Sequence, residues 1–404
     1  MRKEQSIGLD EVLFLILVAD ILFAPFLLSV PAPIAFIILP LWLIALRETP
    51  TARALVPAAV GAALATISYV YGLRDGYLLQ ELARERMANT AIVIFMFGAY
   101  VMLMTTQMRS FAPVATMLRL YLIFLFGMAL IFFVSPGTYF GLRTFWSFND
   151  SVEFGDQVNI LTRFTGTMSD PNNLAVSTCA ITAVLVFYQE AKVWLNLFAL
   201  AMTGVIIVAT MSATGVICFS ILAAAFILAS KLRVPMRIGL LLASAITGLA
   251  IYYVIRETEI FRLATERVME SDADSRFSRW ATAMDMGKFV SSILIGDGGS
   301  IFMNNFEYHP HNGHIHLVYS FGLICYICFA SIFFRIPQIT DWRRYLFLAI
   351  LVIGFTVNVG IYEHRFAGVW VILMVIYHQM TTQNVSRPNR SGSAARQHRP
   401  QPAF

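Results

Sequence analysis

Charged residues are scarce in this chain. They make up 13% of its 404 residues, whereas soluble domains contain about 25%. Hydrophobic residues make up 58%, and the mean hydropathy is +0.70. Apolar windows of about 18 or more residues, long enough to cross the hydrocarbon core of a bilayer, recur along the sequence. The composition excludes an ordinary soluble domain and predicts an all-α polytopic membrane protein that is surrounded by membrane lipids and has no nucleic-acid partner.

Cysteine is also scarce, and its four occurrences all lie within apolar runs. This placement excludes a disulfide framework. Cys325 and Cys328 have CxxC spacing, but within a buried helix this spacing favours packing over a redox or metal-binding role. The N-terminus lacks a small-residue cleavage site, so the first apolar run is expected to be a membrane span and not a signal peptide.

About twelve apolar segments are candidate transmembrane helices. They run over residues 11–30, 31–46, 54–73, 90–108, 114–135, 173–189, 193–210, 213–230, 236–255, 313–334, 345–361 and 366–382. With both termini in the cytoplasm, most basic residues fall on the cytoplasmic side, as expected for inner-membrane proteins. We therefore expect one integral membrane domain over residues 1–382. The tail, 383–404, is rich in Pro, Ser, Arg and Gln, and is expected to be basic, cytoplasmic and disordered.

Two long loops are predicted on the outer, periplasmic side, over residues 136–172 and 256–312. The first is rich in aromatic residues around Trp146, which suit either a membrane-interface belt or stacking on sugar rings. The second is expected to contain an amphipathic interfacial helix over 276–289. Near its end, residues 296–299 (Gly-Asp-Gly-Gly) predict a tight turn. A third outer segment, 74–89, is expected to form a short interfacial helix.

Four of the seven histidines lie between His309 and His316, where the second long loop meets an apolar run. Histidine is the side chain that changes charge near neutral pH without special tuning. Asn312 is a suitable N-cap for a span beginning at Gly313, which places His311 beside a helix N-terminus. There, His311 is a candidate general base for an attacking hydroxyl.

Two other interpretations of the histidine cluster remain open. The imidazoles can simply populate the membrane interface, which is the favoured interpretation for His314 and His316 taken singly. Alternatively, the His-x-His-x-x-His-x-His spacing can supply zinc or copper ligands, with Glu307 or Asp297 as an additional ligand.

Arginines in the predicted outer loops form a second group of candidates. Arg163, Arg276 and Arg279 carry guanidinium groups that match phosphate oxygens in a bidentate manner and stay charged when partly desolvated. Solvated charges or headgroup contacts are the alternative explanation. After Arg163, the sequence Asp170-Pro171-Asn172 predicts a turn that caps the next span and can form a wall of the same site.

The order of these motifs resembles the bacterial O-antigen ligase and polymerase family. The resemblance rests on Arg276-x-x-x-Trp280, on Gly-x-Gly at 296–298, on His309-x-His311-Asn312 and on Gly322, eleven residues after His311. The upstream Arg163…Gly166…Asp170-Pro171-Asn172 is also similar, so the motifs cover residues 160–335. One departure concerns the segment Met211-Ser212-Ala213, where Ala213 stands in place of an arginine that is frequent in the family.

The resemblance implies a polytopic glycosyltransferase (GT-C-like) fold and a metal-independent, inverting transfer without a cofactor. It implies an undecaprenyl-diphosphate-linked glycan as donor. The acceptor would be lipid A–core for a ligase, which we take as the leading expectation, or another lipid-linked glycan for a repeat-unit polymerase. In these terms His311 and Arg276 are catalytic. The substrate-binding residues are Arg163, Arg279, His309, Asn312, Asp170 and Asn172.

Two functions of other classes share this topology. A flippase or transporter of lipid-linked glycans also needs a basic outer site, but such proteins normally carry several ionisable residues within the membrane. This chain has only Asp20 and Arg119 in such positions. A non-catalytic scaffold of a polysaccharide export complex is the third possibility, and it predicts that neither His311 nor Arg276 is needed.

Overall fold

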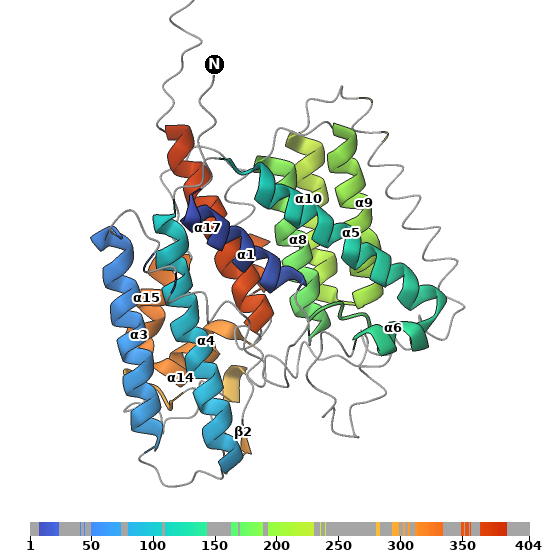
Figure 1. Cartoon of the computed structure of the whole chain (residues 1–404). Helices are drawn as coiled ribbons and strands as arrows, with labels where there is room; N and C mark the ends of the chain where they lie inside the picture. The colour runs from blue at the N-terminus through green and yellow to red at the C-terminus, as the bar shows by residue number, and fades with distance from the viewer. Residues whose placement is uncertain are drawn as a thin grey trace, which may run out of the picture.

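The regular structure in the computed structural model consists of α-helices and one very short hairpin (Figure 1). The structure describes residues 8–23, 41, 44, 50–73, 80–106, 110–143, 163–168, 170–188, 193–229, 235, 239, 280–282, 293–298, 302–303, 306–307, 312–333, 349–350, 352–354, 356 and 364–385. Four helices are long and apolar enough to cross a membrane: Ala52–Gly72, Arg86–Thr105, Ala112–Val134 and Val193–Thr210. The prediction of a helical membrane protein is therefore supported, while the number of twelve spans stays a prediction.

One group of helices is built around α3 (Ala52–Leu73) and α4 (Gln80–Thr105), which pack against each other. α3 also packs against α14 (Gly313–Phe321) and α15 (Leu323–Phe333). The predicted interfacial helix over 74–89 is wrong in its second half, because residues from Gln80 onward belong to the continuous helix α4. Extension of the helix satisfies backbone hydrogen bonds within one segment.

The second group contains α5 (Ala112–Val134), α8 (Pro171–Tyr188), α9 (Val193–Thr210) and α10 (Ala213–Ala229). α8 packs against α9 and α10, and α5 packs against α9. These helices agree closely with the predicted spans 114–135, 173–189, 193–210 and 213–230. A short helix, α6 (Pro136–Arg143), follows α5 in the first long loop and packs back against it.

Two helices lie between these groups and connect them (Figure 1). α17 (His364–Val385) packs against both α4 and α8, and α1 (Leu9–Phe23) packs against α5 and α17. Asp20 on α1 is buried. Arg365 of α17 donates a hydrogen bond to the carbonyl of Ile21 at 3.2 Å, which ties α17 to α1.

The helices expose apolar side chains and bury polar ones, as the helices of membrane proteins do. α3 exposes Val56, Val60, Ile67 and Val70, whereas its Ser68 is fully buried. Lipid tails accept exposed apolar side chains, and polar groups are instead satisfied between helices. The hydroxyls of Thr182 and Thr203, for example, form a 2.6 Å hydrogen bond between α8 and α9.

Candidate functional site

Arg163 lies at one end of the second helix group, in a turn that precedes α8. Its Nε donates to the carbonyl of Thr210, the last residue of α9, at 3.0 Å. Its terminal NH2 donates to Oδ1 of Asn172 in the first turn of α8 at 3.2 Å. Two bonds to two different helices fix the plane of the guanidinium, which is half-buried. This geometry presents a preorganised cation at the helix ends.

Asn172 links Arg163 to the connection between α9 and α10. Its Oδ1 also accepts a hydrogen bond from Ser212 Oγ at 2.7 Å, and Ser212 Oγ accepts from the backbone N–H of Gly215 at 3.1 Å. Both side-chain bonds of Asn172 use the amide oxygen, so its NH2 group is directed to the other side. The turn before α8, the end of α9 and the start of α10 are therefore tied into one network.

Asp170 determines where α8 begins. One of its carboxylate oxygens accepts from the backbone N–H groups of Asn172 at 2.6 Å and Asn173 at 3.1 Å. This is an N-cap, which satisfies otherwise unpaired helix donors and places a negative charge at the positive end of the helix dipole. The predicted turn is confirmed. These bonds assign Asp170 a capping role at the start of α8, where Asn172 lies.

Met211, between Thr210 and Ser212, adopts a left-handed backbone conformation with φ of 49°. It is the only non-glycine residue with positive φ in the described ranges. Such a conformation costs about 1–3 kcal/mol and concentrates at functional sites. Here it turns the chain so that the Thr210 carbonyl and the Ser212 hydroxyl reach the same pair of side chains, Arg163 and Asn172.

Sequence reasoning missed Ser212 and Met211. The segment drew attention only because Ala213 replaces the arginine that is frequent in the resembling family, and Ala213 is exposed at the start of α10. A local signal for Ser212 was nevertheless present. Serine immediately before an apolar helical run is a typical N-cap, and Ser212 does accept from the N–H of Gly215.

Tyr139 of α6 stabilises the turn that contains Arg163. Its hydroxyl accepts from the backbone N–H groups of Thr165 and Gly166, both at 3.0 Å, and its ring packs on Phe164 with centroids 5.1 Å apart. Burial raises the pKa of Tyr139, and its hydrogen bonds and the charge of Arg143 only partly oppose this effect. The hydroxyl is therefore neutral at physiological pH. Tyr139 is buried and so cannot stack on a sugar, while Trp146 lies outside the described residues.

The start of α14 is as predicted. Asn312 has an extended backbone (φ of −145°), and its Oδ1 accepts from the N–H groups of His314 at 3.0 Å and Ile315 at 3.1 Å. The helix begins at Gly313, so residue 311 immediately precedes the capped N-terminus. The structure thus assigns Asn312 a capping role.

The helix in the span predicted over 313–334 is not continuous, because Gly322 (φ of 87°) separates α14 from α15. The turn at 296–298 explains the break. Asp297 N–H donates to the carbonyl of Tyr319 at 2.8 Å and Gly298 N–H to that of Ser320 at 3.0 Å. Carbonyls at a helix end need such donors in a membrane, where water is absent.

Ser68 of α3 connects this turn to the rest of the first helix group. Its hydroxyl donates to the carbonyl of Ser320 at 2.8 Å and accepts from the N–H of Gly298 at 3.0 Å. A Cβ at Gly298 would lie 2.8 Å from the carbonyl oxygen of Ser68, and its φ of +82° is unfavourable for other residues. The Gly-x-Gly motif thus holds the turn at 296–298 against α3 and the end of α14.

The last two histidines of the cluster are directed into the protein. His314 Nδ1 lies 2.9 Å from the hydroxyl of Tyr326, and His316 is fully buried. The membrane-interface interpretation is therefore wrong for His316, because the protein encloses its imidazole. Among the described residues, no group of three or more His, Cys, Asp or Glu side chains forms a metal-binding arrangement.

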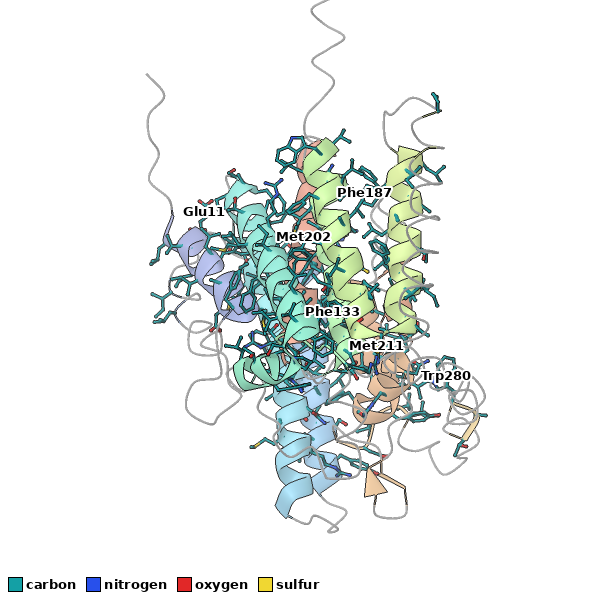
Figure 2. The ribbon with its side chains drawn as sticks, turned by 90° about the vertical axis from the view of Figure 1, so that its right-hand side faces the viewer. Glu11, Phe133, Phe187, Met202, Met211 and Trp280 are labelled. Carbon is teal, nitrogen blue, oxygen red and sulfur yellow. The ribbon has the colours of Figure 1, made fainter. Side chains whose placement is uncertain are left out.

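The remaining predicted site residues, His309, His311, Arg276 and Arg279, lie outside the described residues. Trp280, which follows Arg279, is in a helical turn. Figure 2 places Met211 and Trp280 lower in the view than Glu11 and Phe187. Comparison with known proteins found no matching family model and no similar sequence among curated proteins.

Proposed function

We propose that this chain is a glycan transferase at the periplasmic face of a bacterial inner membrane, with a GT-C-like architecture. It moves a glycan from undecaprenyl diphosphate to a sugar hydroxyl of lipid A–core, as an O-antigen ligase does. One observation carries the proposal. The guanidinium of Arg163 is fixed by Thr210 and Asn172, and Ser212 in turn fixes Asn172.

A fixed guanidinium suits a reaction in which a diphosphate leaves. The bond between the anomeric carbon and the phosphate oxygen breaks, and negative charge accumulates on the departing undecaprenyl diphosphate. A preorganised cation stabilises that charge without reorganising at the moment of reaction, an effect of about 10²–10³ in rate for one donor. In the proposal Arg163 and Arg276 share this task, and Arg279 and the amide of Asn172 contact the donor.

The acceptor hydroxyl needs a base. His311 precedes the N-terminus of α14, whose first turn is capped by Asn312. In the proposal the neutral imidazole of His311 takes the hydroxyl proton as the new bond between acceptor oxygen and anomeric carbon forms. Attack opposite the leaving group inverts the anomeric centre. His309 orients His311, and no metal or cofactor takes part.

The test uses the full-length protein purified into lipid nanodiscs. Donor is an undecaprenyl-diphosphate-linked glycan, and acceptor is either lipid A–core or a second lipid-linked glycan. We expect R163Q, R276A and H311A to lose at least about 10²-fold in turnover. R53Q, which removes an exposed positive charge near the start of α3, serves as the matched control.

The outcomes separate the candidate functions. Wild-type turnover by both H311A and R276A would end the assignment, and full loss of activity on chelation would instead favour a metal site. Transfer to lipid A–core identifies a ligase, and joining of lipid-linked repeats identifies a polymerase. Movement of the lipid-linked glycan across the bilayer without bond formation identifies a flippase.

A further inference from the structure

A second arginine lies beside the same turn and is not explained by the network around Arg163. Arg143 is the last residue of α6, and its side chain is 9% exposed. Its Nε is buried without a hydrogen-bond acceptor, and no ion pair of Arg143 occurs among the described residues. Arg163, in contrast, has protein acceptors at the ends of two helices.

Helix geometry directs Arg143 toward the Arg163 turn. Residues four apart lie on the same face of a helix, so Arg143 follows Tyr139 on one face of α6. The hydroxyl of Tyr139 binds the backbone of Thr165 and Gly166, and the positive charge of Arg143 acts on that hydroxyl. Arg143 therefore lies on the face of α6 that contacts the turn over 163–168, and Arg163 is the first residue of this turn.

The buried Nε–H of Arg143 needs an explanation, because a buried donor without an acceptor is destabilising. The helix dipole at the C-terminus of α6 favours a positive charge there, but it leaves this N–H without an acceptor. An anion bound at this position would supply the missing acceptor.

We propose that Arg143 is an additional anion-binding residue that, together with Arg163, contacts the diphosphate of a prenyl-diphosphate-linked substrate. The inference rests on the proposed function for the identity of the ligand. Two arginines at one turn provide forked donors for the two phosphate groups. Tyr139 then has a further role, because it holds the turn and α6 in a fixed relation.

The experiment measures binding separately from transfer. Full-length protein in phosphatidylcholine nanodiscs is titrated with farnesyl diphosphate, and thermal unfolding is followed with and without this probe. We expect R143Q to weaken binding by at least about tenfold, since charge-assisted hydrogen bonds to phosphate are among the strong ones. R143K, which keeps the charge but not the fork, is expected to be intermediate. R53Q should bind as the wild type does.

The unbound unfolding temperature distinguishes a ligand-binding arginine from a structural one. Removal of a buried, unpaired charge should leave the melting temperature of R143Q unchanged or raise it, while the stabilisation by farnesyl diphosphate is lost. A clear drop in the unbound melting temperature would show a structural role and overturn the proposal. Unchanged affinity of R143Q for the probe would overturn it as well.

Two further arms identify the source of the anion and separate the two proposals. Competition by phosphatidylglycerol, included in a second set of nanodiscs, would assign Arg143 to lipid headgroups and overturn the diphosphate assignment. If the wild-type protein transfers no glycan but binds farnesyl diphosphate through Arg143, the proposed function fails and the anion site stands. If the wild-type protein transfers glycan, and R143Q transfers glycan and binds farnesyl diphosphate equally well, the proposed function stands and the anion site fails.

Discussion

Replacement of Asn172 by alanine is the most informative perturbation of the candidate site. The amide oxygen of Asn172 accepts from Arg163 at 3.2 Å and from Ser212 at 2.7 Å, so N172A removes both bonds. A hydrogen bond to a charged group contributes about 1.5–3 kcal/mol and a neutral one about 0.5–1.5 kcal/mol. Because Arg163 is half-buried, we take the lower part of this range and expect a loss of about 2–3 kcal/mol in unfolding free energy.

The effect on turnover should exceed what the stability loss alone produces. Arg163 keeps its bond to the Thr210 carbonyl but loses the second anchor that fixes its plane. A displacement of about 1 Å in a positioning group can cost about 10²-fold in rate. We therefore expect kcat/KM of N172A to fall by about 10–100-fold in the nanodisc transfer assay.

Two companion variants isolate the cause. N172D keeps both acceptor bonds and adds a negative charge beside Arg163, so it should retain the stability of the wild type but bind the diphosphate more weakly. T178V serves as the control, because it removes the 2.7 Å bond from Thr178 Oγ1 to the Leu174 carbonyl deeper in α8. It should lower stability slightly and leave turnover intact. Equal turnover in N172A and the wild type, or an equal loss in T178V, would refute the reasoning.

Three other variants test the supports of the site. Y139F leaves two buried N–H groups at the Thr165–Gly166 turn without an acceptor and should cost about 2–4 kcal/mol in chemical unfolding; an unchanged unfolding midpoint contradicts this. G298A introduces a Cβ 2.8 Å from the Ser68 carbonyl oxygen and should lower the melting temperature. G127A, with open space around it, should not. Equal melting temperatures of the two variants would show that the turn at Gly298 does not stabilise the contact between α3 and α14. M211G should raise the unfolding free energy by about 1 kcal/mol by relieving the left-handed strain, and a lower midpoint would show that the Met211 side chain matters more than its backbone.

Local rules predicted the helix starts at the site. Asp170 and Asn312 were identified as N-caps from residue type and position alone, and both accept the expected backbone donors. Capping depends on the neighbouring residues only, so sequence is sufficient. The spans predicted over 193–210 and 213–230 likewise correspond to α9 and α10.

The break at Gly322 was not predictable in the same way. Glycine is common in transmembrane helices and often leaves them continuous. Here the helix ends because the turn at 296–298 brings N–H donors to the carbonyls of Tyr319 and Ser320. Similarly, Ser212 reaches Asn172 across 40 residues of sequence. Such long-range contacts depend on tertiary packing, which the helix propensities of single residues do not predict.

The bonds of Ser68 have a consequence for how the protein is made. Ser68 lies 230 residues before Gly298 and 252 before Ser320. A ribosome at about 5–20 residues per second therefore delivers α3 to the bilayer well before either partner emerges. In the interval the Ser68 hydroxyl has neither bond, and the first helix group is incomplete. Any nascent chain that stops short of residue 298 thus leaves this helix interface without both bonds of Ser68.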